Sequence, residues 1–111
     1  MKKIKLVISL VLLLGSSNVF AGSATGKVTF LAVNDQDQVH VITETRGTSI
    51  PSCVTTDSDR LVTDLATEHG KAIYSLLLSA QAQGLDVQIG GKNSCNIRTG
   101  METIQYVIVR P

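Results

Sequence analysis

Residues 67–84 read TEHGKAIYSLLLSAQAQG, and this is the only stretch of the chain with a convincing helical pattern. The hydroxyl of Thr67 can accept a hydrogen bond from the free N–H groups of a first helical turn. Glu68 would lie at the positive end of the helix dipole. Gly84 suits the left-handed residue that ends many helices. The pattern therefore predicts a helix that begins after Thr67 and runs to about Gln83.

The predicted helix carries two apolar stripes. The main stripe has the spacing of a single helix face and consists of Ala72, Ile73, Leu76, Leu77 and Ala80. The second stripe, at i, i+4 and i+8, consists of Tyr74, Leu78 and Ala82. Because one small core needs only one stripe, two explanations of the second are open. Either a loop covers it, or it packs against a neighbouring subunit.

The segments on both sides of the helix show the alternation and composition of strands. The predicted strands are 26–33, 38–46, 52–55, 60–65, 85–89, 94–97 and 102–109, with short members at 52–55 and 94–97. The first two form a hairpin around the polar turn 34–37. The last strand is expected to be central, with Ile104, Tyr106 and Ile108 on one face. The predicted fold class is mainly β with one α-helix.

Residues 1–21 have the three-part layout of a secretory signal peptide. A basic start precedes an apolar run at 6–14, and Val19 and Ala21 occupy the −3 and −1 positions of a cleavage site. The run is shorter than the ~20 residues that a membrane-spanning helix needs. We therefore expect cleavage after Ala21, export to the periplasm or beyond, and a single domain over residues 22–111.

The charge of the exported part excludes several classes of partner. The full chain has 10 Lys and Arg against 9 Asp and Glu, a formal net charge of +1. Lys2, Lys3 and Lys5 belong to the leader, so the formal charge of the exported part is −2. A nucleic-acid binder would show a basic stripe, and a protein of the membrane surface would show a basic cluster. We expect no nucleic-acid partner and no membrane span in the mature chain.

Cys53 and Cys95 are the two cysteines of the chain, and both belong to the exported part. Export delivers them to an oxidising compartment, where a pair in a small domain is most simply one disulfide. The bridge would close a loop of about forty residues and contribute roughly 3–4 kcal/mol through loop-closure entropy. A redox or metal-binding pair is the alternative, but the chain has no C-x-x-C motif.

Residues for catalysis are not assembled in any known pattern. His40 alternates within a predicted strand and is expected at the surface, and His69 falls in the first helical turn. No serine lies in a Gly-x-Ser-x-Gly turn, and bridged cysteines leave no thiol nucleophile. The acidic turns at 35–37 and 57–59 lack the remaining ligands of an EF-hand. We expect no enzyme activity, no metal site and no cofactor.

The order of these features resembles one known group. A leader, two strands, Pro51-x-Cys53, the segment 67–80, Gly84, Cys95 and a final ETIQYV at 102–107 are similar to small exported bacterial proteins. Their layout is similar to the pentameric B subunits of subtilase-cytotoxin and pertussis-like toxins. The resemblance covers residues 50–111 well and 26–46 loosely. It implies a small closed OB-like barrel of five strands, a disulfide, and a pentamer with the helix lining its centre.

Together these features predict an exported, non-catalytic binding module that recognises a glycan or a surface partner. The candidate ligand contacts are polar loop residues, namely Asn34, Asp35, Gln36, Asp37, Gln38, Lys92, Asn93 and Ser94. Tyr74, Leu78 and Ala82 are candidate contacts in a homo-oligomer. The alternative is a periplasmic interaction protein, such as an inhibitor, an immunity factor or an envelope accessory protein.

Overall fold

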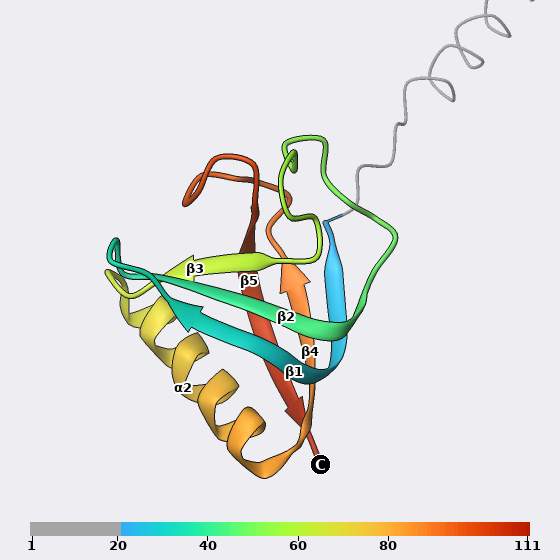
Figure 1. Ribbon diagram of the computed structural model, residues 1–111, viewed down its shortest axis with the longest axis vertical. Coiled ribbons are helices and arrows are strands. Elements are labelled where there is room, and N and C mark those ends of the chain that lie inside the picture. The colour runs from blue at the N-terminus through green and yellow to red at the C-terminus, as the bar shows by residue number, and fades with distance from the viewer. Residues whose placement is uncertain (1–20) are drawn as a thin grey trace, which may run out of the picture.

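The computed structural model describes residues 21–111, in which five strands form a barrel-like ring beside one helix (Figure 1). The elements are β1 (Ser23–Val33), β2 (Gln38–Arg46), β3 (Leu61–Asp64), α2 (Glu68–Gln83), β4 (Asp86–Gly91) and β5 (Glu102–Arg110). The expected mainly β class with one helix is confirmed. The predicted leader lies outside the described residues except for Ala21. In the described part of the chain, no helix has both the length and the apolar character to cross a membrane.

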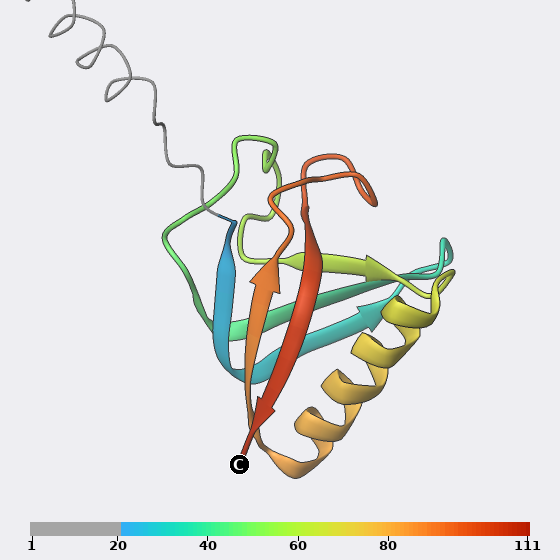
Figure 2. The same ribbon diagram turned by 180° about the vertical axis from the view of Figure 1, so that it is seen from behind.

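Each strand of the ring pairs with two neighbours, in the order β1-β2-β3-β5-β4, with β4 closing onto β1. The pairs are antiparallel except β3 with β5. Figure 2 shows β4 and β5 side by side. Strand β1 serves two neighbours because it bends sharply near Gly26, which has a φ of 101°. Closing the ring pairs the edge strands that would otherwise invite aggregation.

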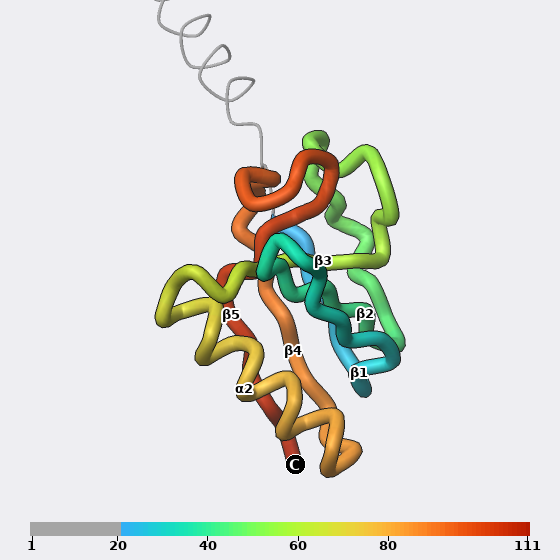
Figure 3. Tube along the Cα trace, turned by 60° about the vertical axis from the view of Figure 1, so that its left-hand side comes forward, coloured from blue at the N-terminus to red at the C-terminus, as the bar shows by residue number. Residues whose placement is uncertain are grey.

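The core fills the ring and is covered by α2 on one side. Its buried apolar residues are Ala24, Val39, Val41, Leu61, Val62, Ile73, Leu77, Ala80, Val87, Ile89, Met101 and Ile104. Figure 3 shows α2 running beside β4 and β5. The predicted main stripe is too wide, because Ala72 and Leu76 are exposed. The buried apolar side chains of α2 form a narrow face of Ile73, Leu77 and Ala80, which packs against the ring.

Both predicted ends of the helix are confirmed. The side chain of Thr67 accepts a hydrogen bond from the amide of Gly70 at 3.0 Å, and Gly84 adopts the left-handed conformation with a φ of 63°. Gly70 is buried, and a Cβ there would overlap the carbonyl oxygen of Asp64. The first turn of α2 therefore packs directly on the backbone that leaves β3.

The predicted faces of β5 are wrong beyond Ile104. Ile104 is buried, but Tyr106 and Ile108 are each 42% exposed, and Val107 packs against the core. The cause is a register shift opposite Gly90 and Gly91, where β5 holds one extra residue. Such a bulge turns the following side chains to the other face of the sheet. The central position of β5, between β3 and β4, is confirmed.

The disulfide between Cys53 and Cys95 is confirmed, with the two Cα atoms 6.0 Å apart. It joins the loop between β2 and β3 to the loop between β4 and β5 at one end of the ring. The amides of Thr55 and Thr56 donate to the carbonyl oxygen of Gly100 beside it, at 3.0 and 3.2 Å. The predicted strands at 52–55 and 94–97 are wrong. Both segments are loops held by the disulfide rather than by a strand ladder.

Candidate functional site

A cavity of about 290 Å³ opens between the start of α2 and the loop that follows β4. Its volume is close to the lower end of the roughly 300–1,000 Å³ typical of small-molecule sites. Thr63, Asp64 and Thr67 line it from the junction of β3 and α2. Lys92 and Asn96 line it from the loop between β4 and β5. Two segments that are about thirty residues apart in the sequence therefore share one pocket, which we call the junction pocket.

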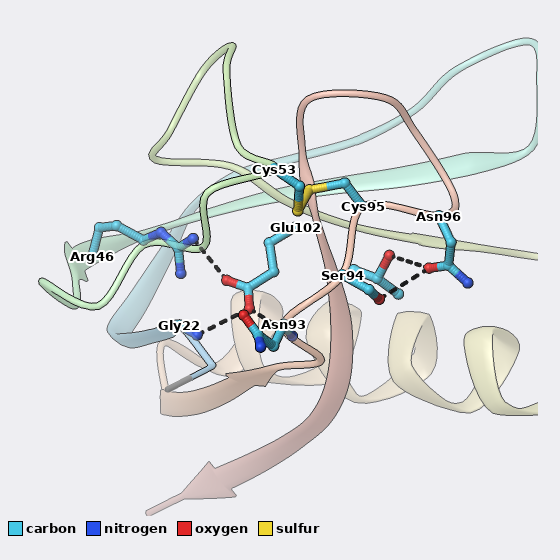
Figure 4. Close-up of a disulfide and its surroundings, with 9 residues drawn as sticks. Gly22, Arg46, Cys53, Asn93, Ser94, Cys95, Asn96 and Glu102 are labelled. Atoms are coloured by element: carbon cyan, nitrogen blue, oxygen red, sulfur yellow. Dashed lines mark hydrogen bonds and ion pairs between the residues drawn. A yellow bond between two sulfur atoms is a disulfide. The ribbon is translucent and has the colours of Figure 1, made fainter. Parts of the chain in front are cut away.

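The loop side of the junction pocket is ordered by hydrogen bonds to Asn96. Its Oδ1 atom accepts from the hydroxyl of Thr103 at 2.8 Å and from the hydroxyl of Ser94 at 3.3 Å (Figure 4). The backbone of the loop is fixed too, because the amide of Thr103 donates to the carbonyl oxygen of Ser94 at 2.8 Å. Because Oδ1 already accepts two hydrogen bonds, the NH₂ group, a donor, is the part of the Asn96 amide left for a ligand.

The helix side of the junction pocket is held in place by turn geometry. Oδ1 of Asp64 accepts from the amide of Ala66 at 3.0 Å, and Oγ1 of Thr67 caps α2. A carboxylate has more acceptor positions than this single bond uses. Asp64 and Lys92 form no ion pair with each other within residues 21–111. A negative and a positive group are therefore both available to a ligand in the same cavity.

His69 also lines the junction pocket, and its ring connects two elements. Its Nε2 atom donates to the carbonyl oxygen of Gln105 at 2.7 Å, which ties the first turn of α2 to β5. A carbonyl can only accept, so Nε2 carries the hydrogen and Nδ1 is the acceptor of the neutral ring. The apolar part of the lining comes from Ile97 and Ile104.

The first predicted ligand-binding loop, Asn34 to Gln38, is the turn between β1 and β2. Asn34 organises this turn, because its Oδ1 atom accepts from the amides of Gln36 and Gln38 at 3.0 Å each. Asp35, Gln36 and Asp37 are exposed at the tip. None of these five residues lines the junction pocket, and the side chain of Asn34 is used to build the turn.

The structure nevertheless brings this turn next to the loop between β4 and β5, which also carries the second predicted set of residues. Nε2 of Gln38 donates to the carbonyl oxygen of Ile97 at 3.1 Å, and Nη1 of Arg98 donates to Oε1 of Gln38 at 3.1 Å. The turn thus contacts the part of that loop at residues 97 and 98, and no hydrogen bond joins the two predicted sets within residues 21–111. Of the second set, Lys92 lines the junction pocket. Asn93 and Ser94 hold the loop conformation, Asn93 with a φ of 58°.

His40 is buried, with 5% of its surface exposed, so its predicted surface position is wrong. Both of its neighbours in β2 are buried as well, because this part of the strand is covered on both faces. Nδ2 of Asn34 approaches Nε2 at 3.4 Å, while Nδ1 has no hydrogen-bond partner within residues 21–111. Burial lowers the pKa of His40 below its ordinary value of 6.5, and Arg98 and Arg60 lower it further, against an opposing effect of Asp57.

Several residues of the junction pocket escaped the sequence-based prediction, including Asp64, Thr67 and Asn96. Asp64 and Thr67 flank the strand-to-helix junction, and this position is the one signal that could have marked them. The sequence predicts a strand at 94–97 that includes Asn96, and the structure has a loop there. Within residues 21–111, no three His, Cys, Asp or Glu side chains gather as a metal site would require.

The second stripe of α2 is not covered by a loop. Leu78 is 42% exposed, Ala82 is exposed and Tyr74 is half-buried. Of the two explanations, the covering loop is therefore wrong for Leu78 and Ala82, and the contact with a neighbouring subunit stays a prediction.

No model of a known protein family, no curated protein and no solved structure matches this chain.

Proposed function

We propose that the exported chain is a non-catalytic binding module that holds a glycan in the junction pocket. One observation carries the proposal: residues with carboxylate, amide, hydroxyl and ammonium groups line one cavity of about 290 Å³ together with apolar side chains. Each sugar hydroxyl both donates and accepts hydrogen bonds, so a glycan uses such a mixed set better than a ligand with a single charge. Ile97 and Ile104 supply apolar contact for the C–H groups of a sugar ring.

The chemistry of the pocket supports binding rather than turnover. Within residues 21–111, no serine, threonine or cysteine side chain is hydrogen-bonded to a histidine, as an activated nucleophile would be. Nε2 of His69 is engaged by a backbone carbonyl, and both cysteines are bridged. The polar groups are instead held by turns and neighbouring side chains, which reduces the ordering that a ligand must impose.

The fold is compatible with the resemblance to toxin B subunits. A five-stranded ring with one helix between β3 and β4 is the arrangement expected of a small OB-like barrel. Half-buried Tyr74 and exposed Leu78 and Ala82 leave a face of α2 free for a neighbouring subunit, which is compatible with a homopentamer in which α2 faces the centre. In this proposal the leader directs the chain to the periplasm or the medium, where several identical pockets on one assembly would bind a glycan-coated surface with avidity.

A glycan array with the purified mature protein, followed by calorimetric titration of the best sugar, tests the proposal. Lys92→Ala and Asp64→Asn should each weaken binding by about tenfold or more, since a hydrogen bond to a charged group contributes ~1.5–3 kcal/mol. Lys27→Ala removes the same charge from an exposed position on β1 and should leave the affinity unchanged. Binding that survives both pocket variants would contradict the proposal.

A periplasmic interaction protein is the second candidate, and exposed apolar side chains favour it. Tyr106 and Ile108 are each 42% exposed on the outer face of β5. A protein partner would cover them, and a one-to-one complex isolated from periplasmic extract should then be lost in Tyr106→Ser. Retention of that complex in Tyr106→Ser, together with its loss in Lys92→Ala, would favour the junction pocket instead.

A further inference from the structure

The carboxylate of Glu102 is completely buried at the start of β5. Oε1 accepts from Nη2 of Arg46 at 2.9 Å, and Oε2 accepts from the backbone nitrogens of Gly22 at 2.9 Å and of Asn93 at 3.1 Å (Figure 4). A buried carboxylate is costly unless its oxygens are paired in this way. We call this arrangement the Glu102 socket.

The Glu102 socket has no room for a side chain at position 22. A Cβ on Gly22 would overlap the carboxylate of Glu102 and would lie 2.7 Å from Nη1 of Arg46. The backbone around Gly22 is fixed on its other side, because its carbonyl oxygen accepts from the amide of Gly91 at 2.8 Å. The nitrogen of Gly22 is therefore held against Oε2 by the backbone itself, and Gly22 is buried whereas Ala21 is exposed.

This nitrogen is also the atom that leader cleavage is expected to release. Hydrolysis of the bond between Ala21 and Gly22 adds the oxygen of water to the carbonyl carbon of Ala21, which leaves as a carboxylate. The nitrogen of Gly22 keeps the bonding electron pair and takes up protons to become an ammonium group. The leader peptidase of the export machinery supplies the catalysis, and water is the only other reactant.

We propose that cleavage turns the hydrogen bond between Gly22 and Glu102 into a buried ion pair, so that maturation itself stabilises the fold. Before cleavage the group is a neutral amide, and afterwards it carries a full positive charge at the same place. Charge-assisted hydrogen bonds are about twice as strong as neutral ones. The inference depends on cleavage after Ala21 and does not depend on which ligand the junction pocket binds.

The ion pair would act on a large part of the molecule because of the other bonds that Arg46 makes. Nη1 of Arg46 donates to the carbonyl oxygen of Ser23 at 3.1 Å, and Nε donates to the carbonyl oxygen of Ser58 at 2.8 Å. The Glu102 socket thus connects β1, the end of β2, the disulfide-bonded loop and β5. A charge added at Gly22 strengthens the point at which these four segments meet.

The test compares the mature chain with a free amine at Gly22 and the same chain with N-acetyl-Gly22. Both are made by joining a synthetic peptide of residues 22–52 to residues 53–111 at Cys53, followed by oxidation. The acetyl group takes the place of the carbonyl and Cα of exposed Ala21, for which the structure has room, so the two proteins differ in charge without a new steric clash. We expect acetylation to lower Tm by roughly 4–8 °C or more. Equal Tm values would overturn the proposal.

A second measurement tests the buried ammonium group directly and needs no variant of Glu102, which could fail to fold. The mature protein recovered from cells should begin at Gly22, and its α-amine should be acylated roughly tenfold or more slowly than in the urea-unfolded chain. Exposed Lys27 and Lys71 serve as internal standards. A mature terminus at another residue, or an α-amine that reacts as fast as in the unfolded chain, would overturn the proposal. Where Glu102→Gln folds, acetylation should no longer lower its Tm, because the carboxylate that pairs with the free amine is gone.

Discussion

The loop between β4 and β5 separates two polar clusters that differ in how their polar atoms are satisfied. In the Glu102 socket both carboxylate oxygens are paired and Glu102 is 0% exposed. In the junction pocket Asp64 accepts one backbone bond and Lys92 has an exposed side chain. Internal pairing marks a polar group that holds the fold together, while unused hydrogen-bonding capacity in a cavity marks one that can hold a ligand. Substitutions in the two clusters should therefore have different effects.

The largest expected effect comes from Glu102→Ala. The side chain of Arg46 is only 11% exposed, and this variant removes the carboxylate with which its guanidinium is paired. Breaking a buried ion pair by removing one partner costs about 3–5 kcal/mol. Urea unfolding should show this loss in the free energy of unfolding. Glu44→Ala is the matched control, since Glu44 is exposed and accepts from the amide of Lys27 at 2.7 Å. A similar loss in both variants would remove the distinction between the Glu102 socket and an ordinary surface carboxylate.

Reduction of the disulfide should come next in size. Cys53 and Cys95 are 42 residues apart, and a loop of this length corresponds to about 3–4 kcal/mol of stabilisation. The double variant Cys53→Ala/Cys95→Ala should lose this free energy in urea unfolding. Because the loop that carries Lys92 and Asn96 is anchored by Cys95, the same variant should also bind its glycan more weakly. Full affinity at full stability would show that neither cluster depends on the bridge.

A smaller effect, confined to binding, is expected from Thr103→Val. The hydroxyl of Thr103 orients the amide of Asn96 at 2.8 Å, and valine keeps the shape without the hydroxyl. Loss of one neutral hydrogen bond amounts to about 1 kcal/mol, so affinity should fall about fivefold, as measured by calorimetric titration. Thr29→Val removes an exposed hydroxyl that donates to the carbonyl oxygen of Ile42 on the far side of the ring and should not change affinity.

The difference between local and long-range interactions explains which parts of the structure the sequence could predict. The boundaries of α2 follow from Thr67, Gly84 and one apolar stripe, which are local signals. The exchange of inward and outward faces along β5 is not a local feature, because it depends on the register shift opposite Gly90 and Gly91 on the facing strand. The sequence predicts Asn34 as a ligand contact because it is a polar turn residue. The sequence does not show that its side chain already accepts hydrogen bonds from the backbone of its own turn.

The junction pocket was missed for a related reason. Asp64 ends β3 and Asn96 lies in the loop between β4 and β5, and only the ring and the disulfide bring these segments together. The sequence predicts Lys92 as a ligand contact in a tight turn. The structure places it in the lining of the junction pocket, and its contact with a ligand stays a prediction. The Glu102 socket was also beyond reach, because no pattern in the sequence links Gly22 to a residue eighty positions away.

The smallest expected effect concerns His40, a buried polar residue that belongs to neither cluster. Its pKa in the folded protein is lowered by burial and by Arg98 and Arg60, so between that value and about 6.5 the unfolded chain binds more protons than the folded one. The free energy of unfolding should therefore fall as the pH drops below about 6.5. Urea midpoints at pH 7.5 and 5.5 measure this fall, and His40→Asn should reduce it, whereas His69→Gln retains His40 and should keep it. An unchanged pH dependence in His40→Asn would mean that the buried ring is protonated as readily in the folded protein as in the unfolded chain.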